Sequence, residues 1–261
     1  MRIEFLTQDD PLYILPFFDE FLRNYAPEFT ILQISCSPTM GRRSRVQLLL
    51  ELMALYGPVG MARLLGMAAT ARVLGRMPRG RNSSLFYGLE QISRAYDIPY
   101  QKIGNPKAAE FVESVRRRSA DVIVSVACPY ILKDALLSLP PRGCVNIHHA
   151  PLPRYKGMMP TFWQLYQGER SVGVTVHWMA AKVDEGAALL QEALEIKPGE
   201  TLHDLIRRSK RHGAHCMARV LHQIESDSQS TKPLNSEQGS YFTFPTIAEI
   251  REFHRRGFRA I

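Results

Sequence analysis

An asparagine and a histidine stand two residues apart at the end of a short apolar run, in Asn146-Ile-His148. Side chains two residues apart on a β-strand point to the same face, so both could reach one atom. An amide and an imidazole that face a carbonyl suit acyl transfer, because both can stabilise a developing oxyanion. A carboxylate would orient the imidazole and hold it positively charged. Asp184, in a turn beside Gly186, is the candidate, although turn capping explains that residue alone equally well.

An open parallel sheet is expected to position these residues. The run from Asp121 to Ala127 is almost continuously apolar, which is typical of a buried parallel strand. Other expected strands cover residues 2–6, 30–35, 100–103, 143–148, 172–179 and 188–196. Asn146 then lies near the carboxyl end of its strand, where ligands of open α/β sheets usually bind, and Pro151, Pro153 and Pro160 stiffen the following loop.

Helical patterns alternate with these strands, so we expect a Rossmann-like α/β fold with a mostly parallel sheet and helices on both faces. The expected helices cover residues 12–24, 85–96, 107–118, 133–137 and 200–222. The turn after the first strand lacks the G-x-G-x-x-G pattern, so a nicotinamide or flavin dinucleotide is not expected.

A helical insertion at about 37–85 is rich in Leu, Met, Ala, Gly and Arg. Two helices are expected there, at about 46–56 and 59–76, with a break at Gly57-Pro58. Glu51, Arg63 and Arg72 interrupt the apolar run, so no membrane span is expected. Its apolar faces could lie on a membrane surface, contact another subunit or pack in the core.

The chain has 261 residues and a formal net charge of +8, which favours anionic partners or an ordinary basic surface. Its four cysteines are far apart and no secretory leader is visible, so a reduced, cytoplasmic protein is expected. We expect a catalytic domain at 1–222, then a linker and a basic C-terminal helix extension at 223–261. The capping-box pattern Thr246-x-x-Glu249 marks the start of that helix.

The stretch from Asp121 to about Lys210 resembles the catalytic domain of the folate-dependent formyltransferases. The order of its motifs agrees with that family: Asn146-Ile-His148, then Leu152-Pro-Arg-Tyr-Lys-Gly157, Gly173-Val-Thr175 and Asp184-Glu-Gly186. The resemblance implies that Asn146, His148 and Asp184 are catalytic. It also implies 10-formyltetrahydrofolate as the formyl donor, with no metal.

The resemblance extends to Ala127-Cys-Pro-Tyr-Ile-Leu132, which matches the segment whose backbone recognises the pterin ring of the donor. It implies that the cofactor site includes Pro129, Tyr130, Ile131, Leu132, Ala180 and Val183. An ordinary strand-to-helix turn is the alternative for the first four. His212-x-x-His215-Cys216 has helical spacing, but a solvated helix face explains it better than a metal site.

Members of that family formylate methionyl-tRNA, glycinamide ribonucleotide or the amine of a nucleotide-linked amino sugar. The loop His149-Ala-Pro-Leu-Pro153 is closer to the sugar-modifying members, so the expected acceptor is the amino sugar of a sugar nucleotide, which is a small phosphorylated or nucleotide-linked amine. A tRNA acceptor is less favoured, because the tRNA enzymes carry a further barrel-like domain. A formyltetrahydrofolate hydrolase and a catalytically silent folate- or nucleotide-binding protein are the remaining alternatives.

Overall fold

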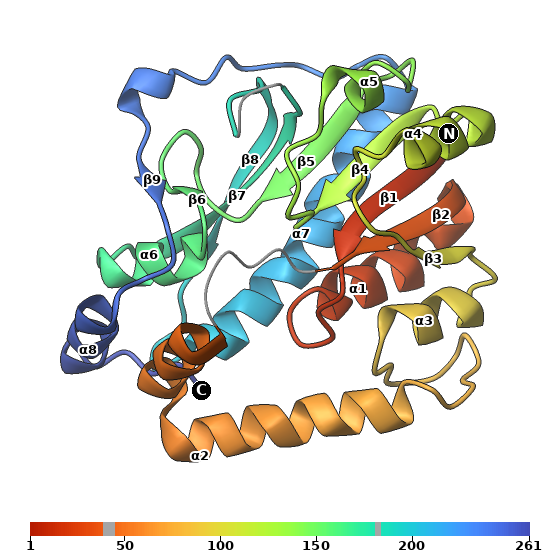
Figure 1. The fold of residues 1–261 in the computed structure, drawn as a ribbon. Helices are drawn as coiled ribbons and strands as arrows, with labels where there is room; N and C mark the ends of the chain where they lie inside the picture. The colour runs from red at the N-terminus through yellow and green to blue at the C-terminus, as the bar shows by residue number, and fades with distance from the viewer. Residues whose placement is uncertain (39–44, 181–183) are drawn as a thin grey trace.

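The computed structural model describes residues 1–38, 45–180 and 184–261. A seven-stranded sheet forms its centre, in the order β3-β2-β1-β4-β5-β7-β8 (Figure 1). The strands are β1 (Arg2–Gln8), β2 (Thr30–Ser37), β3 (Tyr100–Lys102), β4 (Val122–Val126), β5 (Cys144–His148), β7 (Ser171–Trp178) and β8 (Ala188–Glu195). The first five pair in parallel, whereas β7 runs antiparallel to both β5 and β8. The expected mostly parallel α/β fold is confirmed.

Helices cover both faces of the sheet. One apolar core joins the sheet to α1 (Leu15–Tyr25), α3 (Leu89–Ala95) and α7 (Leu202–Glu225), and a second joins the other face to α4 (Ala109–Arg118) and α5 (Asp134–Leu137). All five residues of β4 are therefore buried. The continuous apolar character of that strand follows from this double covering.

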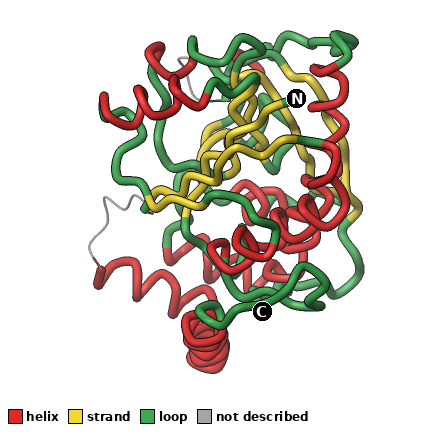
Figure 2. The backbone as a smooth tube through the Cα atoms, turned by 90° about the vertical axis from the view of Figure 1, so that its right-hand side faces the viewer, coloured by secondary structure: helices red, strands yellow, loops and turns green. Residues whose placement is uncertain are grey.

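The inserted helix α2 (Arg45–Leu74) runs along one edge of the molecule (Figures 1 and 2). Gly57 has φ 65° and ψ 175°, so the helix is broken into segments 46–56 and 58–74, as the Gly-Pro pair predicted. By length and composition alone, Val46–Leu74 is apolar enough to cross a membrane, with mean hydropathy 1.5 and 28% of its most apolar window buried. The sequence interpretation underestimated the apolar character of this helix. The break at Gly57 nevertheless leaves each segment shorter than the roughly 20 residues that a span needs.

The C-terminal residues pack against the catalytic body. The C-terminal elements are the 3₁₀ turn η2 (Ser236–Gln238), β9 (Tyr241–Phe242) and α8 (Ile247–Arg255), and they meet β6 (Lys156–Gly157), which pairs with β9, and α6 (Pro160–Tyr166). A further 3₁₀ turn, η1 (Ala26–Glu28), joins α1 to β2. Phe253 of α8 is fully buried and stacks on Phe162 of α6 at 4.8 Å. Thr246 and Glu249 form the expected capping box. The division into domains 1–222 and 223–261 stays a prediction.

Candidate active site

The antiparallel pairing of β5 with β7 brings an asparagine and a histidine together. Asn146 lies directly opposite His177 in the register of the two strands. His177 Nδ1 is 2.8 Å from the carbonyl oxygen of Trp178, which can only accept, so the proton of a neutral ring lies on Nδ1. Its Nε2 then accepts a hydrogen bond from Asn146 Nδ2 at 3.1 Å. One amide hydrogen of Asn146 remains for a ligand.

His148 points to the same face of β5 as Asn146, as strand alternation predicted. Its side chain is about nine-tenths buried. The Nε2–H donates to the carbonyl oxygen of Tyr155 at 2.9 Å, within the proline-rich loop. The opposite nitrogen, Nδ1, faces Asp184 Oδ2 at 3.6 Å. The loop therefore fixes the ring orientation, and the carboxylate lies on the ring's other side.

Asp184 is held between the two imidazoles. Its Oδ1 is 3.6 Å from His177 Nε2, and its Oδ2 accepts a long hydrogen bond from the Gly157 N–H at 3.4 Å. The backbone at Asp184 has φ 53°, a left-handed conformation that aspartate tolerates better than most residues. A Cβ at Gly186 would lie 1.8 Å from the Trp178 carbonyl oxygen, so only glycine lets the turn pack this closely. The three expected residues do converge.

Burial and neighbouring charges shift the pKa values of Asp184 and His148 in opposite directions. Burial alone would raise the pKa of Asp184, but the neighbouring His177 and His148 rings and the Gly157 N–H outweigh burial and lower it. Burial lowers the pKa of His148, and the negative charge of Asp184 offsets only part of that effect. Desolvation therefore disfavours the positively charged form of His148, the form that the sequence interpretation expects Asp184 to stabilise.

Two cavities meet at these residues. The narrow one, of about 150 Å³, is lined by Ser125, Cys128, Pro129, Tyr130, Ile131, Leu132, Asn146, His177, Met179, Ala180 and Asp184. Five of the six expected cofactor contacts therefore lie around one hollow; the sixth, Val183, lies outside the described residues. Within the described chain, the backbone N–H groups of Ile131 and Leu132 have no backbone partner, so this rim suits the edge of a flat heterocycle such as a pterin.

The wide cavity, of about 560 Å³, shares Cys128, Pro129, Asn146 and Asp184 with the narrow one and also includes His148. Its far wall comes from the segment before α1 and from α2, α6 and α7, and it is mostly apolar. Lys210 is the cation there, and burial lowers its pKa to about 8, against an opposing effect of Asp10. Burial raises the pKa of Asp10, although the N–H groups of Tyr13 and Leu12 donate to its carboxylate and oppose that shift.

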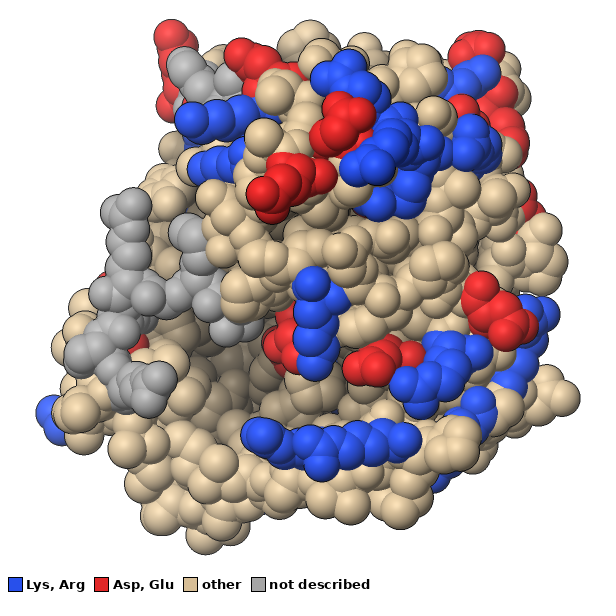
Figure 3. Space-filling view, turned by 45° about the vertical axis from the view of Figure 1, so that its right-hand side comes forward, with Lys and Arg blue, Asp and Glu red and all other residues tan. Residues whose placement is uncertain are grey.

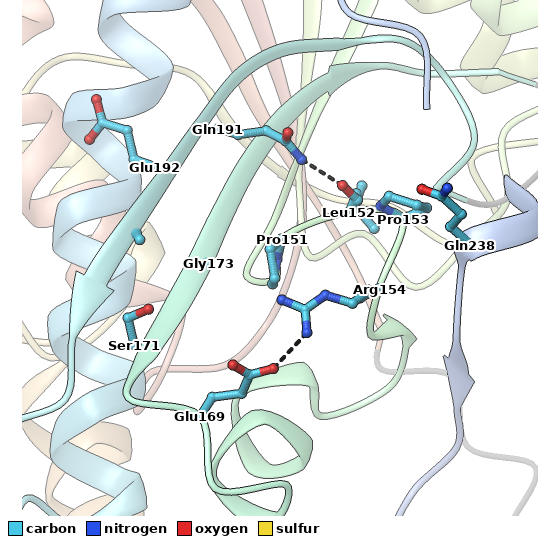
Figure 4. A pocket seen from close by; sticks show the side chains of 11 residues that line it. Pro151, Leu152, Pro153, Arg154, Glu169, Ser171, Gly173, Gln191, Glu192 and Gln238 are labelled. Atoms are coloured by element: carbon cyan, nitrogen blue, oxygen red, sulfur yellow. Dashed lines mark hydrogen bonds and ion pairs between the residues drawn. The ribbon is translucent and has the colours of Figure 1, made fainter. Parts of the chain in front are cut away.

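A third cavity lies behind the proline-rich loop and contains none of the expected site residues (Figure 4). Gln191 on β8 donates to the Leu152 carbonyl at 2.6 Å, and Arg154 pairs with Glu169 at 2.7 Å. These contacts tie the loop to the sheet and to the segment before β7. The residues around this cavity therefore support the loop that orients His148.

One group of possible metal ligands occurs within the described residues, at Glu192, His212 and Cys216. His212 belongs to the helical pattern that the sequence assigned to a solvated face. The Arg219 guanidinium contacts the same Glu192 carboxylate and helps to lower its pKa. A fixed positive charge at that carboxylate opposes the binding of a cation. The absence of a metal from the reaction stays a prediction.

Comparison with known proteins identifies the family of this chain. A family model described as formyl transferase matches residues 89–221, just over half of the chain. The chain belongs to the formyl transferase family. Asn146, His148, Asp184 and the whole lining of the narrow cavity lie within the matched residues.

Curated relatives in this family are methionyl-tRNA formyltransferases. The chain is 35% identical to the one from Pelobacter propionicus over 165 residues, which cover 63% of this chain and 52% of that protein. It is 34% identical to the Moorella thermoacetica protein over 165 residues, 63% of this chain and 53% of the relative. The chain thus spans about half the length of the curated relatives it matches.

Solved structures of family members share the fold. A sugar N-formyltransferase from a Shewanella species aligns with TM-score 0.57 at 17% identity, covering 98% of this chain and 87% of that one. Glycinamide ribonucleotide transformylase 1 from Symbiobacterium toebii aligns with TM-score 0.60 at 17% identity, covering 90% and 94%. At these identities the likeness shows the architecture alone.

His177 is the site residue that sequence reasoning missed, because an ordinary strand histidine explained it equally well. Its position in Gly173-Val-Thr-Val-His177 gave a usable signal. With β5 and β7 paired antiparallel, only the register decides whether this ring meets Asn146. Strand pairing is a tertiary property, so the sequence pattern alone did not select His177.

Proposed function

We propose that the protein transfers a formyl group from 10-formyltetrahydrofolate to a primary amine, with Asn146, His148 and Asp184 as its catalytic residues. The observation that carries this proposal is the position of Asn146 and Asp184 between two cavities. A formyl group held at these residues can be reached from the narrow cavity by its donor and from the wide cavity by an amine. Such an arrangement suits a direct transfer between two bound molecules.

Each residue has a distinct part in the proposed mechanism. The donor supplies the formyl carbon, and its N10 is the leaving group. Asn146 donates its free amide hydrogen to the formyl oxygen as negative charge gathers there. The same negative charge favours protonation of His148, whose Nδ1 faces Asp184. Asp184 is ionised and accepts the proton that the attacking nitrogen loses, directly or through one water. The bond between the formyl carbon and N10 then breaks, and this proton passes to N10, so the products are the formamide and tetrahydrofolate.

For the acceptor, we propose the amino group of a sugar carried by a nucleotide. The loop His149-Ala-Pro-Leu-Pro153 favours this class. The wide cavity supports it, because its mixture of apolar walls with Tyr13, Tyr56 and Lys210 suits a sugar ring with a charged substituent. The Shewanella relative in fold is named as a sugar N-formyltransferase, which is compatible with this choice.

Methionyl-tRNA is the second candidate acceptor, favoured by different observations. The curated relatives at 34–35% identity are named for that substrate, and the net charge of +8 suits a polyanion. Glycinamide ribonucleotide is the third. The loop after β1 weakens the case for that substrate, because the Asp10 carboxylate already accepts the N–H groups that could cradle a phosphate.

Mass spectrometry of candidate acceptors tests the proposal. Amino-sugar nucleotides, methionyl-tRNA and glycinamide ribonucleotide are each incubated with the protein and 10-formyltetrahydrofolate. We expect one added formyl group on an amino-sugar nucleotide and none on the other two. Formylation of methionyl-tRNA alone would move the assignment to the second candidate. Release of tetrahydrofolate without any acceptor would favour the hydrolase.

A further inference from the structure

The first segment of α2 exposes a continuous apolar stripe. Val46, Leu49, Leu50 and Met53 are spaced i, i+3, i+4 and i+7, so they lie on one face of the helix. Their relative exposures are 68%, 54%, 55% and 37%. The opposite side faces the protein, where Leu55 is 1% exposed. Exposed apolar side chains in such a row are unusual for a surface in contact with water.

The second segment of α2 continues this character and adds charge at its borders. Leu65, Ala69 and Val73 follow one another at i, i+4 and i+8 on an exposed face. At about 100° per residue, Arg63 and Arg72 lie on opposite sides of that stripe. Both arginines are exposed. Long cationic side chains at both borders of an apolar stripe are typical of helices that lie in a membrane interface.

The charge of this segment has one sign. Between residues 46 and 88 the sequence has five arginines, at 63, 72, 76, 79 and 81, and one acidic residue, Glu51. Glu51 is 4% exposed, so its carboxylate does not contribute to the outer surface. The lowest part of Figure 3, where α2 runs, shows tan surface with blue side chains and no red ones.

We infer that residues 46–77 dock the protein on the surface of an anionic phospholipid bilayer. The apolar stripes enter the boundary between headgroups and acyl chains, and the arginines contact lipid phosphates. A second copy of the chain is a poorer occupant. A two-fold interface sets the same face against itself, so the exposed arginines would oppose one another without an acidic partner. The break at Gly57 leaves each segment shorter than the roughly 20 residues typical of a span, so the stripes favour a helix that lies on the bilayer surface.

Docking would place the wide cavity beside the membrane. Leu52, Leu55 and Tyr56 of the first segment line that cavity, while neighbouring residues of the same segment form the exposed stripe. One short helix thus has one side at the cavity and another at the proposed bilayer contact. The docking itself does not depend on formyl transfer, so the two proposals can fail separately.

Co-sedimentation of the full chain with vesicles tests the docking. We expect the wild-type protein to pellet with phosphatidylcholine vesicles that contain phosphatidylglycerol, and much less with phosphatidylcholine alone. Arg63→Gln with Arg72→Gln should lower the partition coefficient about fivefold per arginine, since each contributes about 1 kcal/mol near such a surface. Leu49→Ser with Leu65→Ser should lower it at least tenfold.

Matched controls keep the test specific. Arg116→Gln with Arg117→Gln removes two exposed arginines from α4, away from the proposed contact, and should retain wild-type binding. His148→Ala should also bind as the wild type does, whatever its activity. Equal pelleting with both vesicle types would overturn the proposal. So would a dimer in sedimentation velocity that the leucine variant abolishes.

Discussion

The two cavities that meet at Asn146 and Asp184 draw their walls from different parts of the chain. Every residue around the narrow cavity falls between 125 and 184, inside the segment that matches the formyl transferase family. The wide cavity takes a third of its wall from outside that segment, at Gln8, Asp10, Tyr13, Ile14, Leu52, Leu55, Tyr56 and Phe244. The half expected to bind the donor is thus the part shared with the family. The half expected to bind the amine combines that shared part with residues from outside the matched segment.

The largest effect should come from the proposed catalytic residues Asn146, His148 and Asp184, which lie where the two cavities meet. His148→Ala should lower kcat by about 10²–10³, because a group that responds to the developing oxyanion is lost. Steady-state kinetics with the identified acceptor measures this. His215→Ala removes a partly exposed histidine from α7 and should leave kcat unchanged. Full activity of the His148→Ala variant would contradict the proposed mechanism.

His177 should behave as a positioning residue on the narrow side. His177→Ala removes the acceptor for the Asn146 amide, and we expect kcat to fall about tenfold. His177→Gln should restore much of the loss, since its side-chain oxygen can accept the same hydrogen bond. The double variant His177→Ala with Asn146→Ala should be little worse than Asn146→Ala alone. Additive losses would show that His177 acts independently of Asn146.

Bulky substitutions should separate the two sides of the site. Ile131→Trp narrows the small cavity and should raise KM for the donor several-fold, with KM for the amine unchanged. Leu52→Trp intrudes into the wide cavity and should raise KM for the amine several-fold, with KM for the donor unchanged. Initial-rate kinetics with each substrate varied in turn measures both constants. If both variants raise the same KM, the assignment of one cavity to each substrate is wrong.

The smallest effect concerns stability and pH. Burial holds the pKa of His148 and of His149 below the ordinary value of about 6.5, so the unfolded chain binds protons that the folded chain does not. Their contribution is present above about pH 6.5 and is lost as pH falls toward the folded-state values, by up to about 1.4 kcal/mol per pH unit for each ring. The free energy of unfolding in urea, measured from about pH 7.5 down to about pH 5.5, should show this loss, because this range spans the ordinary pKa of histidine. His149→Gln should reduce the slope, whereas His215→Gln should not.

Much of the sheet and of the candidate site was predictable from sequence because the pattern was local. The continuous apolar run at 121–127 predicted β4, and strand alternation put Asn146 and His148 on one face. The Gly57-Pro58 pair predicted the break in α2. These signals depend on few residues close together in the chain.

Features that arise from distant contacts were not predicted. The sheet of β6 and β9 pairs Lys156 with Tyr241 across the molecule, and each strand has only two residues. Helix α6 is short and begins after a left-handed residue, Met159, so no long periodic pattern marked it. The lowering of the His148 pKa also depends on burial by the assembled fold, which the residue types alone do not convey.

Asp10 has a consequence for how this molecule can distinguish ligands. In many open α/β folds the amides after the first strand await a phosphate, but here a carboxylate from the same loop already takes two of them. The protein thus carries an internal mimic of a ligand anion. A ligand anion could use these two N–H groups only if the Asp10 carboxylate moved away from them. The loop after β1 therefore disfavours a phosphate group at this end of the wide cavity.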